Sequence, residues 1–315
     1  MAQEESKTTN ILLESGTNEV ELLEFYLGGE SFGVNVLKVK RIINLKATAI
    51  TKQPCTDPAI LGVINLQDTI IPIIDLALFC EVKGSTDDEA KKIIITEFNR
   101  SIQGFIVDGV NKIHRISWNI FQSVSNKFNL DYITGVCIIE KHNVLVLDFE
   151  KVIGVLSGTQ MLADITPPPP KPTESEAERR GKVKIVCAED SNMVRELLEE
   201  VLNEAGFGQV IIKPNGEELQ KMMAGYEAQS KAEGRPITDF MNAVITDLEM
   251  PLLDGFTLCK GVKTRHPEIP VLVLSSLISD EIVQRCKSVQ ADETVSKGEL
   301  EKLIPALDRL LFSGK

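Results

Sequence analysis

The stretch AVITDLEMPLLDGF, residues 243–256, decides the fold of the second half of the chain. Its apolar start, Ala243 to Ile245, is typical of a strand buried on both faces. Asp247 follows where that strand should end, and ligands bind at the carboxyl ends of strands in open α/β sheets. Met250-Pro251 and Asp254-Gly255 then turn the chain toward a helix. Asp247 is therefore a candidate functional carboxylate, although aspartate is also common in turns.

Polar residues follow three other predicted strands of this half. Glu189-Asp190 ends the run VKIVCAED, Ser275-Ser276 ends VLVLSS, and Lys297 follows Glu293–Ser296. Two adjacent carboxylates repel each other unless a cation offsets their charge. Oxygen ligands of this kind suit Mg²⁺, a hard ion that also bridges phosphate.

The second half alternates strand and helix patterns, which predicts an α/β fold with a parallel, doubly wound sheet of five βα units. A helix is expected over Gly216–Gln229 and a polar loop over Lys231–Thr238. The expected strands are Val183–Ala188, Val210–Ile212, Ala243–Ile245, Val271–Leu274 and Asp292–Val295.

This ordered set resembles the receiver domain of two-component response regulators, from about Lys182 to Lys315. The resemblance implies the strand order 2-1-3-4-5. It also implies that Asp247 accepts a phosphoryl group from a phosphohistidine on a partner kinase. The other implied roles are Mg²⁺ ligation by Asp190 directly, by Glu189 through water and by the backbone carbonyl of Glu249, and contact with the phosphoryl group by Ser275 and Lys297.

Four positions of this half bear on how the receiver would work. Thr294 stands where receivers carry an aromatic switch residue, and Gly298 stands where they carry proline. Glu249 adds like charge near the phosphoryl oxygens, and Leu277 adds apolar cover. Slow hydrolysis or slow loading of the acyl phosphate is therefore expected.

The first half shows many short alternating segments separated by turns, which predicts an all-β sandwich or barrel. The first pair, in which Leu23, Phe25 and Leu27 alternate with polar positions, turns at Gly28-Gly29. A later pair flanks Glu140–Asn143. Acids that follow apolar runs are interpreted as turn and cap residues, since no base or nucleophile accompanies them; they are Asp75, Asp108 and Asp148.

Four phrases between about Val20 and Ile153 resemble the CheW-like domain of bacterial chemotaxis coupling proteins: FYLGGESFGVNVLKVKRI, GVINLQDTIIPIIDL, GFIVDGVNKI and ITGVCIIEKHNVLVLDFEKVI. The resemblance implies paired small β-barrels without enzyme activity that hold a histidine kinase against chemoreceptors. Val39 and Gly62 match positions that the family uses at partner surfaces. Arg41 replaces the usual Glu and Gln67-Asp68 the usual Arg-Gly, which suggests a reversed Arg41–Asp68 ion pair at that surface.

Composition limits the classes of function. The 315 residues suffice for two domains, and a net charge of −12 argues against nucleic acid as a main partner. No apolar stretch is long enough to span a membrane, and the N-terminus lacks the pattern of a signal peptide. The six cysteines are expected to be reduced and mostly buried, and the three histidines to lie on the surface.

These observations divide the chain into a flexible lead (1–18), a coupling domain (19–160), a proline-rich charged linker (161–181) and a receiver (182–315). The prolines of Thr166–Pro172 predict an extended segment. Thr173–Arg180 is charged and lacks core residues, so it is interpreted as spacer. A proline-rich docking motif is the alternative for the linker.

The combination resembles the CheV class of chemotaxis coupling proteins. It implies a cytoplasmic, non-enzymatic scaffold between chemoreceptors and the kinase CheA, recruited to receptor arrays and retuned by phosphorylation of Asp247. One alternative is a phosphate sink in which slow self-dephosphorylation is the function. Another is a structural adaptor whose receiver is inert.

Overall fold

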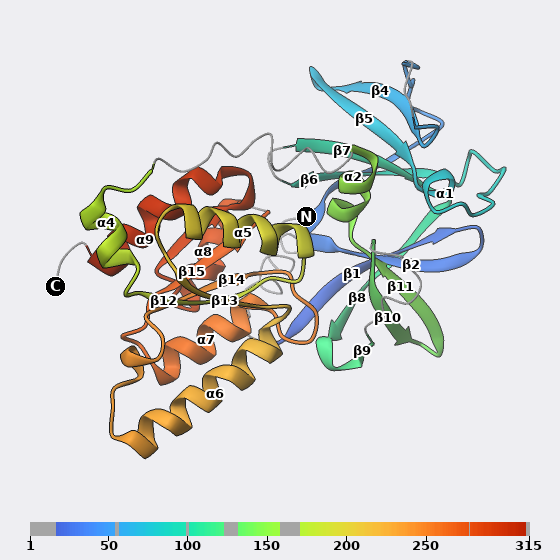
Figure 1. Cartoon of the computed structure of the whole chain (residues 1–315). Helices are drawn as coiled ribbons and strands as arrows, with labels where there is room; N and C mark the ends of the chain where they lie inside the picture. Colours follow the sequence, from blue (N-terminus) through green and yellow to red (C-terminus); the bar gives the residue numbers. More distant parts are fainter. Residues whose placement is uncertain are drawn as a thin grey trace, which may run out of the picture. The chain divides into compact units, whose positions relative to one another are not determined.

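The computed structural model describes residues 17–53, 57–98, 101–122, 132–157, 171–276 and 278–312. The chain divides into two compact units, residues 20–161 and residues 162–315. Figure 1 traces both units. Among the described helices, none is both long and apolar enough to cross a membrane.

The first unit consists of short strands with few helical turns. Its strands are β1 (Glu19–Leu27), β2 (Glu30–Asn35), β3 (Val39–Asn44), β4 (Ile60–Leu66), β5 (Thr69–Asp75), β6 (Lys92–Phe98), β7 (Ser101–Val107), β8 (Gly109–Ser117), β9 (Phe121–Gln122), β10 (Ile133–Ile139) and β11 (His142–Leu147). Its helical segments are η1 (Val36–Lys38), α1 (Leu76–Phe79), η2 (Trp118–Ile120) and α2 (Phe149–Ser157). Within the described residues they form a six-stranded sheet, β8-β1-β2-β11-β10-β9, and a five-stranded sheet, β3-β6-β7-β5-β4. The prediction of an all-β first half is confirmed.

Three two-residue turns set the register of the hairpins in this unit. Gly28-Gly29, Gln67-Asp68 and Glu140-Lys141 all have positive φ angles, between 48° and 87°. Two-residue hairpin loops require this backbone because its twist matches that of the strands, and glycine adopts it without strain. The β10–β11 loop is therefore Glu140-Lys141 alone, shorter than the predicted Glu140–Asn143, and β11 already begins at His142.

Each sheet of the first unit packs its own apolar core. Phe149 on α2 connects the two sheets, since its ring centroid lies 6.0 Å from that of Phe25 on β1 and 4.2 Å from that of Phe105 on β7. The predicted alternation of apolar and polar positions along β1 does not correspond to one buried face and one exposed face. Leu22 and Glu24, on the face expected to be polar, are each only 1% exposed. The second face of β1 is buried because it covers the core of the six-stranded sheet.

The second unit is an α/β fold around a five-stranded parallel sheet. Its strands are β12 (Lys184–Ala188), β13 (Gln209–Lys213), β14 (Ala243–Asp247), β15 (Val271–Ser275) and β16 (Glu293–Ser296). Its helices are α4 (Glu174–Arg180), α5 (Asn192–Glu204), α6 (Gly216–Glu233), η4 (Ile237–Asp239), α7 (Gly255–Arg265), α8 (Asp280–Ser288), η5 (Lys297–Lys302) and α9 (Leu303–Phe312). The sheet order β13-β12-β14-β15-β16 confirms the predicted order 2-1-3-4-5.

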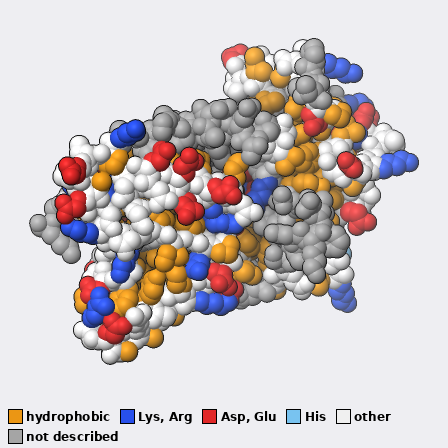
Figure 2. Space-filling model, in the orientation of Figure 1, with side chains coloured by type: hydrophobic (Ala, Val, Ile, Leu, Met, Phe, Trp, Pro, Cys, Tyr) orange, Lys and Arg blue, Asp and Glu red, His pale blue; other side chains and the backbone are white. Residues whose placement is uncertain are grey.

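Helices cover both faces of this sheet, with α5 and α9 on one side and α6 and α7 on the other (Figure 1). Apolar residues of α5 and α9 pack with those of the strands in one buried cluster. The outer face of α5 is acidic, because Glu196, Glu199 and Glu200 are exposed, and Figure 2 shows Asp and Glu side chains over this part of the surface. Such a surface agrees with the negative net charge and disfavours contact with nucleic acid.

The interpretation of Thr173–Arg180 as spacer is wrong. Thr173 and Glu176 form a capping box that starts helix α4, and Arg180 at its end is 5% exposed. Charged residues can belong to a packed helix when each of them forms a hydrogen bond or an ion pair. Counting the apolar residues of a segment does not detect such a helix. The predicted linker up to Pro170, most of the predicted lead, and Cys55 lie outside the described residues.

Helix α6 is longer than the sequence pattern predicts. It continues past Gln229 to Glu233 and ends at Gly234, which adopts the left-handed conformation at φ 63°. Part of the predicted polar loop is thus helical. Its remainder includes the short η4 turn, of which Ile237 is buried. Glycine is the usual residue at such a helix end because it has no Cβ to clash.

Candidate functional site

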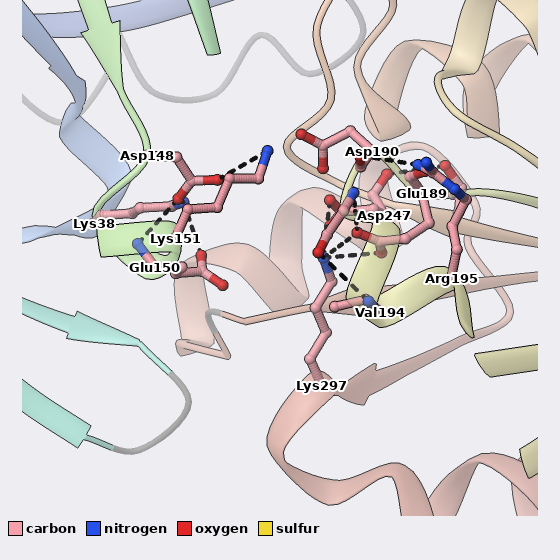
Figure 3. A network of polar contacts seen from close by, with 12 residues as sticks. Lys38, Asp148, Glu150, Lys151, Glu189, Asp190, Val194, Arg195, Asp247 and Lys297 are labelled. Atoms are coloured by element: carbon pink, nitrogen blue, oxygen red, sulfur yellow. Dashed lines mark hydrogen bonds and ion pairs between the residues drawn. The ribbon is translucent and has the colours of Figure 1, made fainter. Parts of the chain in front are cut away.

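Three carboxylates meet at the carboxyl edge of the parallel sheet. Glu189 and Asp190 follow β12, and Asp247 ends β14, the strand hydrogen-bonded beside it. One side-chain oxygen from each lies within 4.8 Å of the others. Glu189 is 0% exposed and Asp247 3%. The predicted acid cluster therefore exists (Figure 3), and two of its three carboxylates are withdrawn from water.

Lys297 reaches into this cluster from the end of β16. Its Nζ lies 2.9 Å from Glu189 Oε2 and 3.0 Å from Asp247 Oδ2, and it donates to Glu189 Oε1 at 3.1 Å. The lysine is itself only 6% exposed. One ammonium group cannot offset three carboxylates, so the site keeps an excess of negative charge when all of them are ionised.

The carboxyl group of Glu189 is affected both by burial and by this excess of negative charge. Burial raises the pKa of its carboxyl group to about 8, with Asp247 and Asp190 adding to the rise and Lys297 opposing it. Within the described part of the chain Glu189 Oε2 accepts no hydrogen bond, so its contact with Lys297 is an ion pair only. Buried carboxylate oxygens in this state fit a hard divalent cation such as Mg²⁺.

The loop after β14 holds Asp247 by close backbone packing. Gly255 begins α7 directly over the strand end, where a Cβ atom would lie 2.0 Å from the carbonyl oxygen of Asp247. Asp254 caps the same helix by accepting from the N–H of Thr257 at 2.8 Å. Glu249 is half-buried in this loop. The lack of space therefore requires a residue without a Cβ atom where α7 begins.

Ser275 ends β15 between the strands that carry Asp247 and Lys297. The register pairs Asp247 with Leu274 and Ser275 with Ser296, which places Ser275 at the same edge of the sheet. Ser275 is 2% exposed. All the predicted receiver residues thus lie at this edge or in the loops that leave it.

Two of the unusual positions lie on β16 or just after it. Thr294 lies on β16 and is half-buried. The N–H of Gly298 donates to Ser296 Oγ at 3.2 Å. Leu277 lies outside the described residues. Position 294 therefore holds a small hydroxyl side chain on β16 in place of an aromatic ring.

The residues predicted to contact partners are spread over the five-stranded sheet of the first unit. Val39 and Arg41 lie on β3, whereas Gly62 lies on β4 and Gln67-Asp68 in the turn after it. In the ladder, β3 and β4 are the two end strands. Arg41, Gln67 and Asp68 are exposed. Gly62 has a structural demand of its own, because a Cβ atom there would lie 2.2 Å from the carbonyl oxygen of Thr51.

The suggested ion pair between Arg41 and Asp68 is absent. Both residues are described, and neither forms a salt bridge within the described part of the chain. Arg41 projects from a strand and Asp68 from the β4–β5 turn, where φ is 63°. Each is therefore presented separately to solvent rather than compensated by the other.

A polar cluster around Glu24 was missed by sequence reasoning. Glu24 Oε2 accepts from Asn111 Nδ2 at 2.8 Å and lies 2.7 Å from His114 Nε2, while Oε1 lies 2.8 Å from His142 Nε2. Burial alone would raise the pKa of Glu24, but hydrogen bonds from His114, His142, Ser31 and Asn111 outweigh it and lower that pKa to about 2. The prediction that the histidines are surface residues is wrong for His114, which is 8% exposed. The sequence offered one signal for this cluster. Glu24 is a carboxylate within a strand whose neighbouring residues are apolar, and such a residue needs polar partners when it is buried.

The acids interpreted as turn and cap residues have those roles. Asp75 caps α1, and Asp108 accepts from the N–H groups of Gly28 and Ser85 at 2.7 and 2.8 Å. Asp148 accepts from the N–H of Glu150 at 3.0 Å and pairs with buried Lys38 at 3.3 Å, a group also drawn in Figure 3. Burial would raise the pKa of Asp148, but Lys38 and Lys151 hold it well below its ordinary value.

The described cysteines are free thiols. Cys137, Cys187, Cys259 and Cys286 are buried and Cys80 is partly buried. Burial raises the pKa of Cys80 and Cys137 to about 11. These thiols are therefore protonated near neutral pH and serve as small apolar groups in the packing.

Comparison with known proteins identifies both halves. The CheW-like domain family matches residues 21–156, and the response regulator receiver domain family matches residues 185–308. Chemotaxis protein CheV3 of Helicobacter pylori is 30% identical over 97% of this chain and 98% of its own length. Chemotaxis protein CheV2 of the same organism is 26% identical over 99% of this chain and 100% of its own length.

Solved structures give matches to single units. The receiver domain of the histidine kinase CKI1 from Arabidopsis thaliana, complexed with Mg²⁺ and BeF3⁻, is 17% identical, with a TM-score of 0.39. That match covers 43% of this chain and 94% of the CKI1 receiver.

Proposed function

Because the chain belongs to the CheV class of chemotaxis coupling proteins, in which a CheW-like domain is joined to a receiver domain, we propose that it is a scaffold regulated by phosphorylation of Asp247. The observation that carries this proposal is the position of Lys297, within 3.0 Å of both Asp247 and Glu189 in a buried acid cluster. A structural acid at a strand end needs neither a buried lysine nor two further carboxylates.

Each residue of the cluster has a role in the proposed reaction. An oxygen of Asp247 attacks the phosphorus of a phosphohistidine on the kinase, the P–N bond breaks, and an acyl phosphate forms. Lys297 then pairs with the new phosphoryl oxygens, and the Ser275 hydroxyl donates to one of them. The shift of Ser275 moves the end of β15 and the loop after it, which carries the signal away from the site.

The donor set fits Mg²⁺ through Asp190, Asp247, the backbone carbonyl of Glu249 and, through water, Glu189. When bound, Mg²⁺ supplies positive charge against which an anionic nucleophile and an anionic phosphoryl group can approach each other. The pKa of Glu189, raised to about 8, supports this reading, because a cation would relieve the repulsion that contributes to the rise.

The first unit supplies the coupling function in this proposal. It joins chemoreceptors to the kinase CheA, so that a cytoplasmic protein is recruited to membrane receptor arrays through its partners. The proposed contact surface includes Val39, Arg41, Gly62, Gln67 and Asp68. The exposure of Arg41, Gln67 and Asp68 supports it, and their charges set specificity more than affinity. A change of only about 1.4 kcal/mol in the free energy of partner binding would change the dissociation constant tenfold.

The test is phosphoryl transfer from phosphorylated CheA to the full chain in the presence of Mg²⁺. We expect label on the wild type and none on Asp247→Asn. Asp280→Asn, which alters an exposed acid at the start of α8, serves as the control and should be labelled normally. Equal labelling of wild type and Asp247→Asn would overturn the assignment. No labelling of any folded variant would leave an adaptor with an inert receiver.

A phosphate sink is the second candidate, and the coupling surface motivates it. Arg41 and Asp68 depart from the family pattern and form no compensating ion pair in the described chain. Co-sedimentation of the full chain with receptor–kinase complexes separates the two functions. Stable co-sedimentation supports the scaffold, whereas rapid labelling without co-sedimentation supports the sink.

A further inference from the structure

Arg195 on α5 lies beside the acid cluster without belonging to it. Its Nη1 donates to the backbone carbonyl oxygens of Glu189 at 2.7 Å and of Asp190 at 2.9 Å. Its Nη2 donates to Asn192 Oδ1. In Figure 3, Arg195 lies on the side of Glu189 and Asp190 away from Lys297. The guanidinium thus holds the backbone of both residues whose side chains supply carboxylates.

The loop needs this support because it leaves the sheet at the acid pair. The ladders of β12 with β13 and β14 end at Ala188. The N–H of Glu189 donates to the Lys213 carbonyl at 3.0 Å, which fixes the entrance of the loop. The two carbonyls that follow receive hydrogen bonds from Arg195 instead of from a strand. Holding the carbonyl of a residue fixes the ψ angle of that residue, and so the backbone from which the carboxylates of Glu189 and Asp190 project.

Position and charge predict opposite effects for this arginine. As a positive charge near a cation site, Arg195 repels Mg²⁺, so its removal should tighten Mg²⁺ binding. As the group that orients the ligand loop, it pre-forms the site, so its removal should weaken Mg²⁺ binding. The sign of the change therefore distinguishes the two roles.

We propose that Arg195 is a positioning residue that holds the backbone of Glu189 and Asp190 so that their carboxylates converge with Asp247 on Mg²⁺. This inference rests on the Mg²⁺ site of the proposed function. Groups that orient metal ligands typically contribute 10- to 100-fold in metal affinity, so a loss of roughly this size is expected when the guanidinium is removed.

The test is calorimetric titration of the full chain with MgCl2, comparing wild type, Arg195→Met and Arg195→Lys. Methionine retains the unbranched stem without donors, and lysine retains charge and donors on one nitrogen. We expect Arg195→Met to bind Mg²⁺ about 10- to 100-fold more weakly, and Arg195→Lys to lie between it and wild type. The control is Arg235→Met, which removes an exposed arginine paired with Glu233 and Asp239, and it should bind as wild type does.

Thermal unfolding of the same samples tests whether each variant is folded. Weaker Mg²⁺ binding by folded Arg195→Met, with partial recovery in Arg195→Lys, supports the positioning role. Unchanged or tighter binding by Arg195→Met would overturn it while leaving the proposed Mg²⁺ site intact. A wild type that binds no Mg²⁺ would overturn both.

Discussion

Arg180 and Asp308 form a two-point ion pair between the ends of the receiver unit. Arg180 Nε donates to Asp308 Oδ1 at 3.0 Å, and Nη2 donates to Oδ2. Arg180 Nη1 also donates to the carbonyl oxygen of Ala205 at 2.9 Å. Helix α4 is thereby fixed to α9 and to the end of α5. It is part of the receiver fold rather than of a spacer.

Removing this pair should destabilise the receiver. We expect Arg180→Met to lower the free energy of unfolding by about 2–3 kcal/mol, less than the ~3–5 kcal/mol of a fully buried pair because Asp308 is partly exposed. Lys182→Met is the control, since its pair with Glu178 is exposed and should contribute less than about 1 kcal/mol. Urea unfolding followed by the helical circular dichroism signal measures both, and equal effects would contradict the structural role of α4.

The Glu24 cluster predicts acid sensitivity of the coupling unit. Hydrogen bonds lower the pKa of Glu24 from 4.5 to about 2, so the ionised carboxylate stabilises the fold above pH 4.5. That contribution should be lost as the pH falls from 4.5 toward 2. At neutral pH, Glu24→Gln should cost about 1–3 kcal/mol, because buried donors lose a charged acceptor.

Trp118 provides the measurement for this unit, since it is the single tryptophan and is 7% exposed in the core of the six-stranded sheet. Urea unfolding followed by its fluorescence should show a flatter dependence on pH in Glu24→Gln than in wild type. Glu97→Gln, which removes a partner of an exposed pair with Lys40, should leave the pH profile unchanged. An identical profile in wild type and Glu24→Gln would refute the assignment.

Gly255→Ala should disrupt the phosphoacceptor loop. Its Cβ atom would lie 2.0 Å from the Asp247 carbonyl, so the loop must move, at a cost of about 3 kcal/mol. Gly261→Ala in the same helix is the control. There the nearest atom is Arg265 Nη1 at 3.4 Å, and the change should stabilise the helix by about 0.5–1 kcal/mol. Thermal unfolding would test the opposite signs, and a neutral Gly255→Ala would contradict the close approach.

Glu249→Asn should accelerate either the hydrolysis of the acyl phosphate on Asp247 or the transfer of the phosphoryl group to Asp247. Glu249 lies two residues after Asp247 and is half-buried, so its charge opposes the approach of an anion. Removing about 1 kcal/mol of repulsion corresponds to roughly a 3- to 10-fold faster rate. Labelled acyl phosphate gives both rates, with Glu268→Gln, an exposed acid before β15, as control. If both rates match those of wild type, Glu249 does not tune the site.

Much of the receiver followed from local patterns. Buried parallel strands are continuous apolar runs, so Ala243–Ile245 and Val271–Leu274 were recognisable, and the polar residue after each run marked the functional edge. The helix end at Glu233 was not recognisable, because the segment after Gln229 is polar and polar residues occur in both helices and loops. Helix α4 was missed for the same reason.

The sequence by itself determined the succession of the receiver strands along the chain, the two-domain organisation and the identity of the residues at the strand ends, because these depend on periodicity and position along the chain. Only the tertiary structure decided which charges are compensated. Lys297 pairs with Glu189 and Asp247, and Arg180 with Asp308, whereas Arg41 and Asp68 do not pair with each other. Compensation of one charge by another depends on the distance between the two groups and on how deeply each is buried. For residues far apart in the chain, both quantities are set only when strands and helices pack.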